Sequence, residues 1–183
     1  MVAAVLAEAG GPLVIQSVAK PIPAPDDVLI MVRACGLGLT LVWNRDGRRR
    51  PGRLPRIIGH EIAGEIVEVG ERVSRVHVGD RVAVYYYLVC GSCRWCRSGR
   101  ESLCDNRDGQ IGSSHDGGLA EFVLVPQANV CLLPDNVSYV DAAIAADAIA
   151  TSHHILTARA LVAAGETVLV VGDGADYIGK QAG

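Results

Sequence analysis

The sequence has no apolar run long enough to cross a bilayer. The longest, around Val82–Val89, is about half of the roughly 18 residues that a membrane-spanning helix needs. The N-terminal segment lacks the basic region of a secretory signal peptide and reaches Glu8 too early for one. Internal repeats and low-complexity tracts are also missing. We therefore expect a cytoplasmic protein with no membrane partner.

The sequence also has no excess of Lys and Arg over Asp and Glu, which argues against nucleic acid as a partner. Lys and Arg together number 17 and Asp and Glu 20, so the formal net charge is −3. Hydrophobic residues make up 50% of the chain and charged residues 20%, a balance typical of a globular protein. The length of 183 residues predicts one domain, or one domain and part of another.

Six cysteines in a reducing compartment call for an explanation other than disulfides, and metal ligation is the first candidate. Four of them are closely spaced as Cys-x2-Cys-x2-Cys-x7-Cys: Cys90, Cys93, Cys96 and Cys104. Four thiolates at this spacing can enclose one structural Zn²⁺ with no open coordination position. Two disulfides, ordinary thiols and an iron–sulfur cluster are the alternatives, although the fourth spacing departs from a ferredoxin run.

Short β-rich segments separated by Gly and Pro dominate the first part of the chain, which predicts a barrel or sandwich. The expected strands are Val2–Ala7, Leu13–Val18, Val28–Arg33, Glu61–Val69, Arg81–Val89, Leu119–Pro126 and Asn129–Leu133.

The pattern changes after Pro134. Residues from Ser138 to about Ala164 are rich in alanine and predict helix in two pieces, with Ser138 and Asp141 near the N-cap. The apolar run Thr167–Val171 then predicts a strand that ends in a Gly-rich turn, as at the start of an α/β domain.

A second motif begins at Gly59-His60-Glu61 and continues with Gly64, Gly70 and Val73. This stretch resembles the signature of the zinc-containing medium-chain alcohol dehydrogenases. The four-cysteine segment is similar to the structural zinc lobe of that family. The segments Gly79–Val82 and Gly117–Phe122 also resemble the family in order and spacing.

The resemblance implies a mainly β fold with α: a GroES-like β-barrel with a structural zinc lobe, C-terminal helices and the first strand of a Rossmann domain. The catalytic domain would span residues 1–164 with its zinc lobe at 88–106, and residues 165–183 would begin a truncated Rossmann domain. The implied activity is hydride transfer between a small alcohol, or an aldehyde or ketone, and NAD or NADP. We expect this chain to be inactive alone, and homo-oligomers are plausible.

The resemblance also implies a catalytic zinc that lowers the pKa of the alcohol oxygen. His60 matches the family's histidine ligand, Glu61 the adjacent glutamate, and Thr40 the hydroxyl that relays the substrate proton. Asp147 falls where the family has a Cys or Asp ligand. The alternative for Asp147 is a charge on the solvent face of its helix.

Gly38 stands where the family has its first cysteine ligand, and Leu41 replaces an aspartate. Cys35 lies three residues before this position, which suits a buried small apolar residue better than a replacement ligand. A catalytic zinc would therefore rest on His60, Glu61 and Asp147, more weakly than with a thiolate.

The Gly-rich turn is the last departure. Gly172 and Gly174 resemble the start of a dinucleotide-binding loop, but Tyr177 stands where a third glycine belongs, and Gly179 comes two residues late. Two other functions remain open. The chain could be a non-enzymatic zinc-binding relative, or a zinc-independent NADPH reductase of the same fold.

Overall fold

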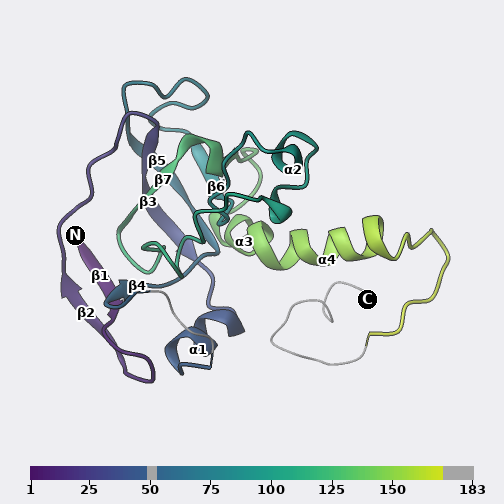
Figure 1. Cartoon of the computed structure of the whole chain (residues 1–183), viewed down its shortest axis with the longest axis horizontal. Helices are drawn as coiled ribbons and strands as arrows, with labels where there is room; N and C mark the ends of the chain where they lie inside the picture. The colour runs from purple at the N-terminus through teal and green to yellow at the C-terminus, as the bar shows by residue number, and fades with distance from the viewer. Residues whose placement is uncertain (49–52, 171–183) are drawn as a thin grey trace.

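The structure is a computed structural model that describes residues 1–48 and 53–170. Its strands precede the helical segment at the end of the described chain, as Figure 1 shows. The strands are β1 (Val2–Leu6), β2 (Leu13–Ser17), β3 (Asp27–Cys35), β4 (Arg56–Ile57), β5 (Ile62–Val69), β6 (Arg81–Val84), β7 (Phe122–Pro126) and β8 (Val130–Leu132). The helices are α1 (Leu39–Arg45), α2 (Arg94–Arg97), α3 (Tyr139–Ile144) and α4 (Ala150–His154). Short 3₁₀ turns lie at η1 (Glu101–Leu103) and η2 (Gln127–Asn129), and π-helical turns at η3 (Ala145–Ile149) and η4 (Ile155–Arg159).

Two antiparallel sheets form the β layer of the described residues. The larger sheet has five strands in the order β7-β3-β5-β6-β8, and the smaller has three in the order β2-β1-β4. The pairing of β3 with β5 shifts register between Leu29 and Ile30 and again between Val32 and Ala34. Such irregularities bend a strand, and they let the larger sheet curl around its apolar side.

The main core lies inside this curl. It consists of β-branched side chains that alternate along the strands, as expected where every second residue faces inward. Its buried members are Val28, Ile30, Ile62, Ile66, Val76, Val82, Val84, Ile111, Val123 and Val125. A smaller cluster of Leu6, Leu41 and Ile58 ties α1 to the three-stranded sheet.

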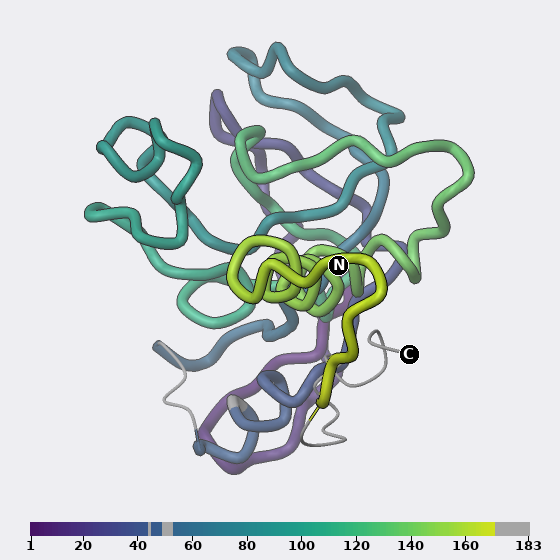
Figure 2. Tube along the Cα trace, turned by 90° about the vertical axis from the view of Figure 1, so that its right-hand side faces the viewer, coloured from purple at the N-terminus to yellow at the C-terminus, as the bar shows by residue number. Residues whose placement is uncertain are grey.

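The elements from α3 to η4 form one continuous helical segment. Ser138 caps its start, because the Ser138 hydroxyl accepts a hydrogen bond of 3.1 Å from the backbone N–H of Asp141. Ala142 and Ala143 pack closely on Ala63 and Ala83 of the larger sheet, since alanine lets two backbones approach. Figure 2 views this segment nearly end-on, with the teal loops around residue 100 standing to one side of the sheets.

The predicted fold class is confirmed, since the chain is mainly β with few helices around a curled sheet. Several elements differ from the prediction. The sequence pattern does not anticipate α1, β4 or α2, and the run predicted as Arg81–Val89 pairs as a strand only to Val84. The helix predicted in two pieces is one continuous segment, because no Gly or Pro interrupts Tyr139–Arg159. Residues 167–170 form no strand, because the described residues offer them no neighbouring strand with which to pair. None of the described helices is both long and apolar enough to span a membrane.

Candidate metal centres

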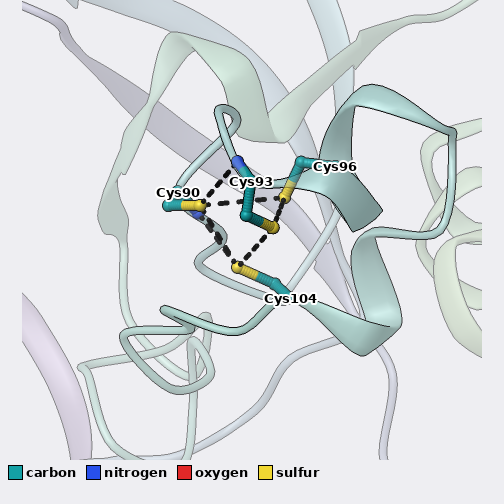
Figure 3. A group of neighbouring side chains, drawn as sticks. All are labelled: Cys90, Cys93, Cys96 and Cys104. Carbon is teal, nitrogen blue, oxygen red and sulfur yellow. Dashed lines mark hydrogen bonds between the residues drawn. The ribbon is translucent and has the colours of Figure 1, made fainter.

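The four closely spaced cysteines converge on one point (Figure 3). A tetrahedral Zn²⁺ with bonds of about 2.3 Å requires sulfur atoms about 3.8 Å apart. The structure places the sulfurs of Cys90 and Cys104, and of Cys93 and Cys96, at 3.5 Å, and two further pairs at 4.0 Å. No cysteine is in a disulfide. The cluster therefore fits a structural zinc with a complete set of thiolate ligands.

Backbone N–H groups surround this cluster and favour its ionised form. The N–H groups of Cys93 and Cys90 donate to the sulfurs of Cys90 and Cys104, each at 3.4 Å. Hydrogen bonds from Ser92 and Cys93 lower the pKa of Cys90 to about 5. Desolvation raises the pKa of Cys96 to about 12. Thiols so close together cannot all ionise without a cation, and a divalent cation removes this conflict.

A second cluster joins His60 and Glu61, which lead into β5, to Asp147 on the helical segment. One ligand atom from each of the three residues lies within 4.8 Å of the other two. His60 Nε2 is 3.0 Å from Asp147 Oδ2, although the two residues are 87 positions apart in sequence. Gly59 sets up this approach, since its φ of +101° suits glycine and a Cβ there would meet Cys35 Sγ at 2.7 Å.

Asp147 lies in the π-helical turn η3, and its carboxylate points into the protein. Besides the contact with His60, its Oδ1 accepts hydrogen bonds from the Tyr86 hydroxyl at 3.1 Å and from Thr151 Oγ1 at 3.2 Å. Burial opposes the charge of Asp147, but these partners, led by His60, hold the pKa of the carboxyl below its usual range. The solvent-face alternative for Asp147 therefore does not describe this structure.

Glu61 is the most deeply buried acid of the cluster. Only 2% of the residue is exposed, and its Oε2 has no hydrogen-bond partner among the described residues. Burial raises the pKa of Glu61; the charge of His60 opposes this rise, and the charge of Asp147 adds to it. An unpaired buried carboxylate is costly, and a bound cation would relieve that cost.

The two glycines before α1 border the Glu61 carboxylate. A Cβ added at Gly36 would meet Glu61 Oε2 at 1.9 Å, so no side chain fits there while Glu61 keeps its position. A Cβ added at Gly38 would lie 3.6 Å from Glu61 Oε1, an ordinary contact. The residue set thus fits a cation held by one imidazole and two carboxylates, and it does not supply the thiolate that the resemblance implies at position 38.

A small cavity of about 60 Å³ opens beside this cluster. Thr40 from the first turn of α1 lines it, together with His60, Asp147 and Tyr86. The Tyr86 ring packs edge-on against the His60 ring with centroids 4.9 Å apart. A larger cavity of about 820 Å³ lies elsewhere, between the N-terminal strands and β7, and none of the three cluster residues lines it.

Sequence reasoning missed Tyr86. It belongs to the run Tyr85–Tyr87, whose signal was three adjacent aromatic residues directly before the cysteine segment. Cys35 belongs to neither metal cluster and packs against the main core, where burial raises its pKa to about 12. Gly172 and Gly174 lie outside the described residues.

Comparison with known proteins identifies the family. The family model described as "Alcohol dehydrogenase GroES-like domain" matches residues 24–135. The chain belongs to this family, that of the medium-chain alcohol dehydrogenases. It is 41% identical over 163 residues to L-threonine 3-dehydrogenase of Rhizobium johnstonii, covering 87% of this chain and 46% of the relative. The corresponding protein of Sinorhizobium medicae is 44% identical over 160 residues, covering 84% of this chain and 45% of the relative.

Solved structures show the same fold. A cobalt- and zinc-bound thermostable alcohol dehydrogenase from Pyrobaculum aerophilum matches with a TM-score of 0.90 and 33% identity, over 97% of this chain and 54% of that one. A zinc-binding dehydrogenase from Sinorhizobium meliloti bound to NADP matches with a TM-score of 0.75 and 35% identity, over 84% of this chain and 44% of that one. The chain spans about half the length of the curated relatives it matches.

Proposed function

We propose that residues 1–164 form the catalytic domain of an NAD(P)-dependent alcohol dehydrogenase, and that residues from 165 onward begin its cofactor domain. The observation that carries the proposal is the convergence of His60, Glu61 and Asp147 beside a cavity that Thr40 lines. The substrate would be a small alcohol or the corresponding carbonyl compound. Support comes from relatives that are dehydrogenases and from neighbours solved with zinc or NADP.

Each residue of the site would have a separate role. Thr40 would hydrogen-bond the substrate hydroxyl and move its proton away from the cavity. Tyr86 and Thr151 would hold the Asp147 carboxylate in place beside His60. The Tyr86 ring would exclude water from the His60 side of the cavity. A divalent cation bound by His60, Glu61 and Asp147 would supply Lewis-acid polarisation of the substrate oxygen.

A chimera tests this proposal. The chain is fused after Gly165 to the second half of the Rhizobium johnstonii L-threonine 3-dehydrogenase, which lies beyond the matched region. We expect the fusion, loaded with a divalent cation, to reduce NAD or NADP with at least one compound from a panel of alcohols and amino alcohols. His60→Ala should abolish that turnover. A fusion that binds NADH by fluorescence but oxidises no compound of the panel contradicts the proposal.

The second candidate is a zinc-independent reductase of the same fold, and Gly38 favours it because no thiolate ligand is present. Metal content separates the two functions: a cation at the His60 cluster supports the dehydrogenase, and the cysteine zinc alone supports the reductase. A cytoplasmic location belongs to the proposal as well, because four cysteines that serve as thiolate ligands suit a reducing compartment.

A further inference from the structure

The strongest unexplained feature of the molecule is the Glu61 carboxylate. It is buried, one of its oxygen atoms lacks a partner among the described residues, and it belongs to a cluster with a histidine and a second carboxylate. An unpaired buried carboxylate is costly, and this cost can be relieved either by a proton or by a bound cation. The His60 ring already contacts Asp147. The single positive charge of one imidazolium would not neutralise both Glu61 and Asp147.

The surroundings of Glu61 explain its position. The carboxylate lies beside both glycines: a Cβ at Gly36 would clash with Oε2, and a Cβ at Gly38 would be in ordinary contact with Oε1. The backbones also meet, since the N–H of Gly36 donates to the Glu61 carbonyl at 2.8 Å. The Glu61 carboxylate therefore lies directly beside position 38, where the family has a cysteine side chain.

We infer that Glu61 is a permanent ligand in place of the residue-38 thiolate, and that this site binds an oxygen-preferring divalent cation of the Mn²⁺ class. The inference rests on the proposed function in placing a cation at this cluster. A donor set of one imidazole and two carboxylates suits harder cations with water in the remaining positions, whereas thiolates select zinc. Zinc is not excluded from such a site, but its advantage over Mn²⁺ is smaller than at a site with a thiolate.

Metal binding by the full 183-residue chain tests this inference without any turnover. The cysteine site is first filled with Zn²⁺, and Mn²⁺ is then titrated while the six-line electron paramagnetic resonance signal of free Mn²⁺ is followed. We expect one bound Mn²⁺ per chain. Glu61→Gln should remove this binding, and a calorimetric melting transition like that of the parent shows that the variant is folded. No bound Mn²⁺ in the parent chain would overturn the inference.

Substitutions at the two glycines provide matched variants. Gly38→Cys adds a thiolate where the backbone has room. Loss of a residue that only hydrogen-bonds a metal ligand changes metal affinity about 10–100-fold. A new thiolate ligand should therefore raise the ratio of Zn²⁺ to Mn²⁺ affinity at least about tenfold. Gly38→Ala adds the same Cβ without a donor and should leave the ratio unchanged. Gly36→Ala adds a Cβ where Glu61 lies and should weaken Mn²⁺ binding at least about tenfold.

The results separate this inference from the proposed function. An unchanged ratio in Gly38→Cys, or a Gly36→Ala variant that binds Mn²⁺ like the parent while folded, means that Glu61 does not hold the place beside position 38. The proposed function fails independently, if the cofactor-binding chimera shows no turnover with either Zn²⁺ or Mn²⁺. Mn²⁺ binding without turnover therefore supports the inference and counts against the function.

Discussion

At the scale of single residues, the site depends on how Asp147 is held. Its two oxygens accept hydrogen bonds from the side chains of His60, Tyr86 and Thr151, of which only Thr151 lies on the same helical segment. Tyr86 contributes both a hydroxyl to Asp147 and an aromatic edge to His60. The same burial that surrounds Tyr86 raises the pKa of its hydroxyl, so it stays a hydrogen-bond donor at neutral pH.

Replacing Tyr86 with Phe removes the hydroxyl and keeps the ring. We expect divalent-cation affinity at the His60 cluster to fall about tenfold, because partners behind metal ligands orient them. Calorimetric titration of Mn²⁺ or Zn²⁺ into chain with a filled cysteine site measures the change. Tyr85→Phe, one position away, is the matched control and should bind like the parent. Equal affinities for both variants and the parent would show that Tyr86 does not position Asp147.

At the scale of elements, one helical segment brings the distant ligand to the sheet. Ser138 caps its first turn, alanines seat it against the larger sheet, and the π-helical turn η3 carries Asp147. Wider turns of this kind are rare and occur often at functional sites, because they turn one side chain out of the regular helical face. The cap thus fixes where the segment begins, and the wide turn carries Asp147.

Ser138→Ala tests the contribution of the cap. The variant leaves the Asp141 N–H without its partner, which should cost about 1 kcal/mol of unfolding free energy. For a chain of this size, the melting temperature should fall by about 2–4 °C in a calorimetric scan. Thr157→Ala is the control on the same segment: its exposed hydroxyl only donates back to the His153 carbonyl, so stability should barely change. A fall of similar size in both variants would argue against a specific capping effect.

At the scale of the whole molecule, the described residues form two clusters of different chemistry that could each hold a metal ion. The cysteine cluster offers four soft sulfur ligands, and the His60 cluster offers one nitrogen and carboxylate oxygens. The first has no open position and suits a structural role, whereas the second borders a cavity. The two clusters share no residue, so they should bind their metals independently.

We expect metal analysis of the purified chain to show one zinc that resists mild chelation and one cation that exchanges readily. Cys93→Ser should lose the resistant zinc and make the loop at 88–106 sensitive to proteolysis, because three thiolates no longer complete the shell. Inductively coupled plasma mass spectrometry before and after dialysis measures both metals. Two zincs per chain that both resist chelation would contradict this assignment, as would unchanged zinc content in Cys93→Ser.

The sequence by itself determined the features whose parts are close along the chain. The spacing of the four cysteines within 15 residues defines a zinc-sized shell, because short loops leave few other arrangements. Short β-rich runs separated by Gly and Pro predicted most of the strands, and Ser138 with Asp141 marked the start of the helix. The motif around Gly59-His60-Glu61 indicated the family, which the comparisons then showed.

Only the tertiary structure decided what depends on contacts between distant segments. Sequence placed Asp147 in a helix but did not reveal which face it occupies, since a π-helical turn shifts the helical period. Its contact with His60 joins residues 87 positions apart. Likewise, the sequence shows at Gly38 only that a thiolate ligand is missing. The structure adds that the buried Glu61 carboxylate lies beside this position. Long-range packing sets both arrangements, and local patterns do not encode it.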